Sequence, residues 1–83
     1  MNMTEEIRSR LESAFSPREL EVVNESYKHA GHAGDDGTGE SHFQVMIRAD
    51  ELAAQGRVAR HRAVIRALGD IPARIHALGL DIG

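Results

Sequence analysis

The chain has 83 residues, enough for one small domain but near the lower limit for a domain that folds without disulfides or bound metal. It contains no cysteine, which excludes disulfides and thiolate metal sites, and its net charge of −3 disfavours a general affinity for nucleic acid. No segment reaches the ~20 apolar residues of a membrane span, and the acidic start MNMTEE does not resemble a secretory signal. We therefore expect a single domain over residues 1–83, located in the cytoplasm.

A helix is expected at the start of the chain, with Thr4 as its N-terminal cap. Its apolar residues recur at spacings of three and four, as one face of a helix requires. This stripe consists of Ile7, Leu11, Ala14 and Phe15. Pro17 ends the helix, because proline disfavours helical geometry in the residue before it. The next segment, residues 20–26, is rich in β-branched residues and predicts a strand.

A second strand is expected over residues 42–48, where Phe43, Val45 and Ile47 alternate with other residues and share one face. Residues 29–41 separate the two strands and are too many for a tight hairpin turn. They include two histidines and several glycines. Since long loops inside compact domains are often functional, we expect this loop to contribute to function.

The second half of the chain predicts two helices and a last strand. A short helix is expected from Asp50, its cap, through Gln55, and a longer one over residues 57–68 that ends at Gly69. The apolar face of the longer helix would consist of Val58, His61, Ile65 and Leu68. Residues 74–82 are expected to form the last strand.

The resulting order, α–β–β–α–α–β, predicts a mixed α/β fold of the α+β type. It would consist of a three-stranded sheet with its helices packed on one face. The predicted core residues are Phe15, Val22, Phe43, Val45, Ile47, Ile65 and Leu68.

Several sequence blocks resemble the signature of the BolA family, in the family's order and over most of the chain. They are residues 24–32 (NESYKHAGH), 40–43 (ESHF), 60–62 (RHR) and 75–78 (IHAL). The resemblance implies a fold similar to the class II KH domain. It also implies partnership with a monothiol glutaredoxin and its glutathione in iron–sulfur cluster handling. Bacterial members resemble DNA-binding transcriptional regulators linked to cell morphology and stress.

The resemblance gives His76 the role of metal ligand, because the family supplies the histidine of the last strand to a [2Fe–2S] cluster shared with glutaredoxin. The family's second ligand lies in the loop between the first two strands, where His29 and His32 compete. The neighbouring glycines favour His32, which needs slack to reach a partner. The alternatives are a His76 held by hydrogen bonds at a strand edge and loop histidines that are only solvated.

The absence of cysteine bears on this cluster. Most protein-bound clusters need four protein ligands, largely thiolates. This chain supplies imidazole only. Any cluster would therefore be shared with a partner that provides the sulfur ligands, and none is expected in the isolated protein.

Four arginines on the 57–68 helix are the candidate nucleic-acid-binding residues: Arg57, Arg60, Arg62 and Arg66. Basic side chains along a helix can neutralise phosphates. The alternative is a solvated face or a patch for an acidic or glutathione-bearing protein partner. His61 is expected to be structural, on the apolar stripe of this helix. His42 is expected to be exposed on its strand, with a place beside the cluster as the alternative.

No catalytic motif is evident, since the chain lacks a cysteine nucleophile, a defined serine–histidine–aspartate arrangement and a phosphate-binding loop. We therefore predict a binding module rather than an enzyme. The leading hypothesis is a glutaredoxin partner that shares a [2Fe–2S] cluster through His76 and His32. The alternative is a DNA-binding transcriptional regulator of stress response and morphology.

Overall fold

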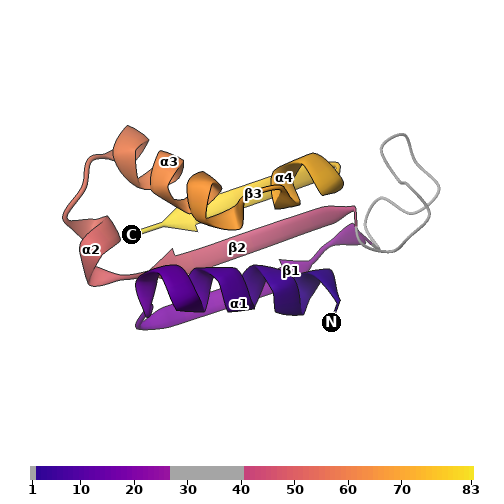
Figure 1. Cartoon of the computed structure of the whole chain (residues 1–83), viewed down its shortest axis with the longest axis horizontal. Coiled ribbons are helices and arrows are strands. Elements are labelled where there is room, and N and C mark those ends of the chain that lie inside the picture. The colour runs from indigo at the N-terminus through magenta and orange to yellow at the C-terminus, as the bar shows by residue number, and fades with distance from the viewer. Residues whose placement is uncertain (1, 27–40) are drawn as a thin grey trace.

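The computed structural model describes residues 2–26 and 41–83 of the chain. In chain order its elements are α1 (Met3–Phe15), β1 (Glu19–Asn24), β2 (His42–Arg48), α2 (Asp50–Ala53), α3 (Arg57–Leu68), α4 (Ile71–Arg74) and β3 (Ala77–Ile82) (Figure 1). This confirms the predicted order, with α4 as a further short helix before the last strand. None of the helices in the described ranges is both long and apolar enough to cross a bilayer.

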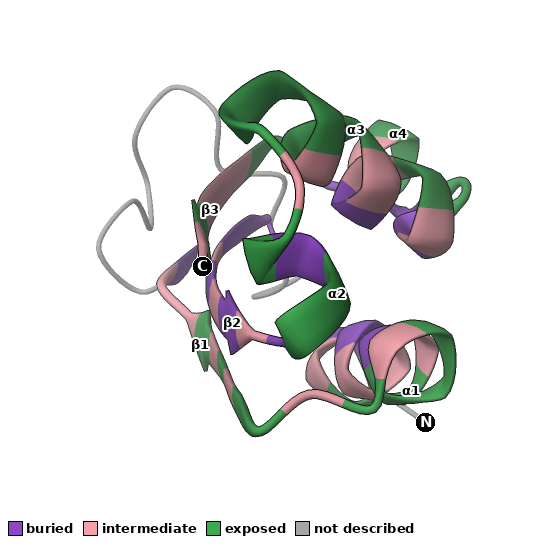
Figure 2. Cartoon of the chain, turned by 90° about the vertical axis from the view of Figure 1, so that its left-hand side faces the viewer, coloured by how far each residue is buried: buried purple, intermediate pink, exposed green. Residues whose placement is uncertain are grey.

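β2 is the central strand of a mixed sheet with the order β1-β2-β3. β1 pairs with it in antiparallel orientation, with Val22 opposite Val45, and β3 pairs in parallel orientation, with Phe43 opposite Leu78. The helices α1 to α4 all lie on one face of this sheet, as Figure 2 shows in an end-on view. The predicted three-stranded sheet with helices on one face is therefore confirmed.

The core lies between the sheet and the helices. Phe43, Val45 and Ile47 are at most 3% exposed, which confirms the predicted facing of β2. Other fully buried side chains are Ile7, Leu11, Leu52, Val64, Leu68 and Ile71. Among the predicted core residues, Phe15 and Val22 are half-buried against this cluster, and Ile65 is also half-buried. The helices thus contribute more of the core than the sequence pattern indicated.

The cap of α1 is Asn2 and not Thr4. The Asn2 side-chain oxygen accepts a hydrogen bond from the Glu5 N–H at 2.9 Å, so it satisfies one of the free amides of the first turn. Thr4 lies inside that turn. At the other end, Ser16 adopts the left-handed conformation, with φ of 46°, and ends the helix one residue before the proline.

The two short helices also differ from expectation. α2 ends at Ala53, and Asp50 is its first helical residue, preceded by Ala49 at the cap position without a side-chain hydrogen bond. Pro72 lies in the first turn of α4, where its missing N–H would have no acceptor within the helix. The buried Ile71 anchors this turn to the core. The predicted strand over residues 74–82 is therefore shorter and begins after the turn.

α3 packs through a face that the sequence predicted only in part. Val58 and His61 were expected to face the core, but both are exposed, Val58 by 63%. The buried residues of α3 are Leu68, as expected, and Val64, which the predicted face did not include. Arg60 lies on the same stripe as these two residues, one turn before Val64, and is half-buried. A long arginine stem can cover apolar surface while its charged head finds a polar partner, which an apolar–polar pattern does not register.

Two valines of α3 can be used to test which face of this helix is buried. Val64→Ala should lower the free energy of unfolding by about 2 kcal/mol, because it removes two buried methyl groups and leaves a cavity. Val58→Ala should change it by less than about 0.5 kcal/mol, because this side chain is exposed and alanine is a good helix former. Urea denaturation measures both, and equal losses would contradict the packing described.

Candidate functional site

Two buried serines, Ser26 and Ser41, join the end of β1 to the start of β2, and we call them the serine network. The Ser26 Oγ accepts hydrogen bonds from the N–H of Ser41 at 2.8 Å and from the N–H of His42 at 3.0 Å. Its own hydroxyl lies 3.5 Å from the His42 carbonyl oxygen. These serines border residues 27–40, so the network holds the two chain positions that flank this segment close together.

The position of Ser26 is itself fixed by its neighbours. The Asn24 side-chain oxygen accepts the Ser26 N–H at 2.9 Å, the local turn that asparagine favours. The Glu25 N–H donates to the His42 carbonyl oxygen at 2.8 Å and extends the pairing of β1 with β2. These two hydrogen bonds therefore fix the position of Ser26 along β2.

The serine network also fixes the backbone of His76. The Ser41 carbonyl oxygen accepts hydrogen bonds from the N–H of His76 at 2.8 Å and of Ala77 at 3.0 Å. His76 lies directly before β3, and its side chain is exposed. Figure 1 shows that β2 and β3 begin at the same end of the sheet. An accessible imidazole is thus presented at that end by a buried, hydrogen-bonded backbone.

His42 contacts His76, and the expectation that His42 is exposed was wrong. It is only 8% exposed, and its Nδ1 lies 2.7 Å from the Ser41 Oγ. The two imidazole rings are tilted by 47°, with 5.1 Å between their centres. Parallel pairing of β2 with β3 brings them together, since His42 pairs with Ala77. His42 thus lies beside the candidate ligand His76, and the alternative of a place beside the cluster stays a prediction.

The described residues supply only part of the predicted ligand set. His29 and His32 lie outside the described residues, so their proximity to His76 stays a prediction. Within residues 2–26 and 41–83, no three histidine, cysteine, aspartate or glutamate side chains gather in a way that could hold a metal ion. The exposed His76 could supply one imidazole ligand, and because the chain has no cysteine, the thiolates of any cluster would have to come from elsewhere.

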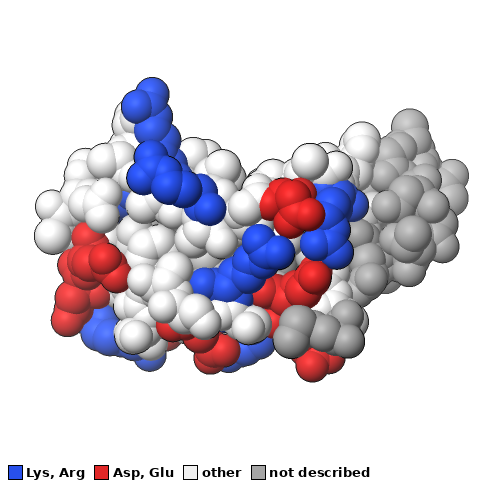
Figure 3. Space-filling model, viewed as in Figure 1, with Lys and Arg blue, Asp and Glu red and all other residues white. Residues whose placement is uncertain are grey.

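The arginines of α3 differ from most others in the chain. Most of the arginines elsewhere pair with carboxylates: Arg10 with Asp70, Arg18 with Asp50, Arg48 with Asp81 and Arg74 with Glu6. Arg57, Arg62 and Arg66 are exposed and have no carboxylate partner among the described residues. Figure 3 shows basic side chains gathered over α3. This helix therefore presents uncompensated positive charge, as its candidate role requires.

Arg60 differs from its three neighbours. It is half-buried, and its Nη1 donates to the Ile82 carbonyl oxygen at 3.2 Å. Its guanidinium is therefore partly committed to β3 and is less available to phosphates.

Sequence reasoning gave no role to Ser26 or Ser41. The signal was present, because both serines belong to the blocks that resemble the BolA signature and each borders the long loop. Their role depends on hydrogen bonds between distant segments, so it becomes visible only in the folded chain.

Comparison with known proteins gives concordant matches. The sequence model of the family described as BolA-like protein matches residues 11–82. A Sinorhizobium sp. protein from the cobS 5′ region is 48% identical over 83 residues, covering 98% of this chain and 89% of that protein. The DNA-binding transcriptional regulator BolA of Escherichia coli strain K12 is 38% identical over 81 residues, covering 96% and 73%. The structure of BolA1 from Arabidopsis thaliana is similar with a TM-score of 0.85 at 34% identity, covering 99% and 90%.

The serine network can be tested by removing one hydroxyl. Ser26→Ala should lower the free energy of unfolding by about 2–4 kcal/mol, because it leaves two buried N–H groups without an acceptor. The amide signals of Ser41 and His76 should shift in the NMR spectrum of the folded variant. Ser13→Ala, at an exposed position of α1, is the matched control and should be neutral. A Ser26 variant as stable as this control would show that the network contributes nothing.

Proposed function

Because this chain belongs to the BolA-like protein family, we propose that it is a binding module, without catalytic activity, that pairs with a monothiol glutaredoxin in the cytoplasm. The two proteins would share a [2Fe–2S] cluster, with His76 and a loop histidine as the ligands from this chain. One observation carries the proposal. The backbone N–H of the exposed His76 donates to the carbonyl oxygen of Ser41, which borders the segment that contains His29 and His32.

The surroundings of His76 suit a ligand that must be held ready for a partner. Its backbone N–H is bonded to a buried carbonyl oxygen, and its ring lies against that of His42. Contacts of this kind restrict the orientations of a ligating imidazole and reduce the entropy lost on binding. His42 therefore serves as a positioning residue in the proposed site.

The chemistry of the ligands explains why a partner is needed. Imidazole in place of thiolate raises the reduction potential of a [2Fe–2S] cluster. With no cysteine in the chain, the thiolates would come from the glutaredoxin and its bound glutathione. Of the two loop histidines we favour His32 as the second ligand, because it lies between glycines, with His29 as the substitute.

The proposal is tested by substituting His76. His76→Ala should weaken the cluster-bound heterodimer by at least about tenfold while changing the free energy of unfolding by less than about 0.5 kcal/mol, since the exposed side chain packs little. The measurements are visible absorbance and circular dichroism of the cluster reconstituted with a monothiol glutaredoxin, and nitrogen hyperfine coupling in the reduced state. His61→Ala, at an exposed position on α3, is the control and should share the cluster normally.

The loop histidines complete the same experiment. His32→Ala should weaken the heterodimer less than His76→Ala if His29 takes its place, and the double loop variant should match the His76 loss. If His76→Ala unfolds the domain while the remaining folded protein still shares the cluster, His76 is structural and the site is wrong.

A second candidate function is binding to DNA through α3. It is favoured by the exposed arginines without carboxylate partners on that helix, and by the similar Escherichia coli protein, which is a DNA-binding transcriptional regulator. The net negative charge of the whole chain opposes it, so binding would depend on this one helix.

Salt dependence tests this second function. If the arginines contact phosphates, Arg62→Gln and Arg66→Gln should each reduce the slope of log affinity against log salt concentration by about 0.9 for duplex DNA. Fluorescence anisotropy at several salt concentrations measures the slope. A slope that neither substitution changes would remove α3 from the interface.

A further inference from the structure

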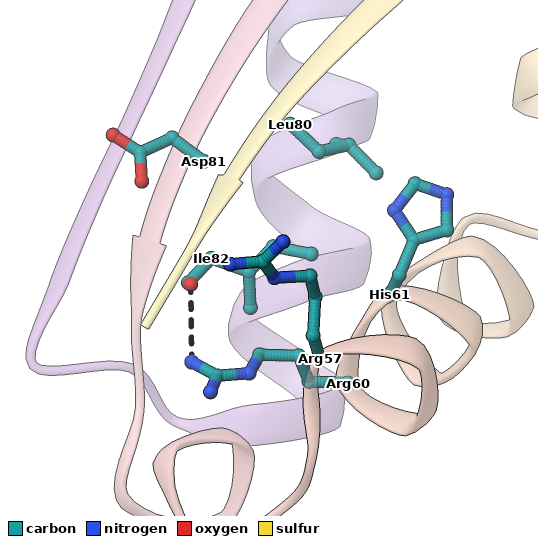
Figure 4. Close-up of a pocket in the computed structure, with 6 residues that line it drawn as sticks. All are labelled: Arg57, Arg60, His61, Leu80, Asp81 and Ile82. Atoms are coloured by element: carbon teal, nitrogen blue, oxygen red, sulfur yellow. Dashed lines mark hydrogen bonds between the residues drawn. The ribbon is translucent and has the colours of Figure 1, made fainter.

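An open pocket lies between the start of α3 and the end of β3, far along the sheet from His76. It has a volume of about 420 Å³ and is lined by Arg57, Arg60, His61, Leu80, Asp81 and Ile82. Figure 4 shows the side chains of Arg57 and His61 directed toward β3, and the Arg60 guanidinium bonded to the Ile82 carbonyl oxygen. The pocket is therefore a groove with a helix on one side and a strand on the other.

The groove is positively charged. Its acidic member, Asp81, directs its carboxylate away from the groove, and that carboxylate lies 3.0 Å from Arg48. Arg57 is exposed with no carboxylate partner among the described residues, and the buried Nε of Arg60 has no hydrogen-bond partner there either. The side chains directed into the groove thus favour an anionic ligand.

The start of α3 strengthens this preference. Its cap residue is Gly56, which has no side chain to accept a hydrogen bond from the free amides, and the first turn contains no acidic residue. Free amides and the helix dipole already make a helix start positive, and a basic residue there is unfavourable without an anion. Arg57 occupies that position. Arg57 therefore lowers the stability of the start of α3, and a bound anion would offset this loss.

The other side of the groove is the outer edge of β3. The N–H groups of Ala77 and Gly83 donate to carbonyl oxygens on the β2 side, so alternate residues of β3 face β2. By the same alternation, the N–H and C=O groups of Leu78 and Leu80 face outward, where no strand among the described residues pairs with them. An unpaired edge of this kind is a template for a further strand.

We propose that this groove binds an extended acidic segment of a partner protein. The segment would add a strand to the outer edge of β3 and place a carboxylate against Arg57, an interaction that does not depend on cluster sharing. A peptide fits better than a nucleic acid, because outward backbone groups at Leu78 and Leu80 match the spacing of another peptide backbone. The described residues that line the groove also include no Phe, Tyr or Trp, the large rings on which bases usually stack.

The test uses the full chain, labelled with nitrogen-15, and a capped peptide of alternating glutamate and valine as the probe. Addition of the peptide should shift the amide signals of Leu78 and Leu80 and slow their hydrogen exchange. Arg57→Glu should weaken binding at least about tenfold, whereas Arg62→Glu should change it less than about twofold. The two substitutions change the charge of α3 equally, but only Arg57 lines the groove.

Stability separates lost binding from lost folding. Because an acidic residue suits a helix start, Arg57→Glu should be at least as stable as the parent protein. A peptide with lysine in place of glutamate, and one with N-methyl groups on the pairing edge, should not bind.

Three results would overturn the proposal: equal losses from the two arginine substitutions, undiminished binding of the N-methylated peptide, or binding of a single-stranded oligonucleotide at Leu78 and Leu80 in place of the peptide.

Discussion

The carbonyl oxygen of Ser41 accepts hydrogen bonds from two consecutive backbone N–H groups, those of His76 and Ala77. Because the parallel pairing of β2 with β3 starts at this oxygen, it sets both the register of β3 and the height at which His76 leaves the sheet. Ser26 holds Ser41 in turn through a second buried hydrogen bond. One short hydroxyl side chain thus joins the end of one strand, the start of the next and the candidate ligand, in an interior where unpaired polar groups are costly.

The sequence predicted β2 well, and α3 less well, for one physical reason. In β2, the side chains of Phe43, Val45 and Ile47 are wholly apolar. Their spacing of two residues therefore indicates which face of the strand is buried. In α3, Arg60 occupies the buried stripe with its aliphatic stem, while the apolar Val58 is exposed in the first turn. Burial is decided atom by atom, but a hydrophobic pattern scores whole residues.

The candidate site was only partly accessible to sequence reasoning. His76 was identified through a family resemblance, not through periodicity. Its contact with His42 could not be foreseen, because parallel pairing brings these residues together across a connection that contains three helices. Ser26 and Ser41 resemble ordinary loop residues in a sequence, and only their burial and partners reveal what they do. Local patterns specify strands and helices, whereas the polar contacts that orient a ligand are tertiary.

β3 connects the two surfaces of interest, since His76 precedes it and the basic groove lies at its end. As an edge strand it is bonded to one neighbour within the described fold, and such strands open locally more readily than central ones. An opening of β3 would free the His76 backbone and remove the outer edge of the groove together. A ligand that binds only the closed strand, at either end, reduces the population of the open form. Two ligands that never touch would therefore strengthen each other's binding through a shared local unfolding equilibrium, without any change in the closed structure.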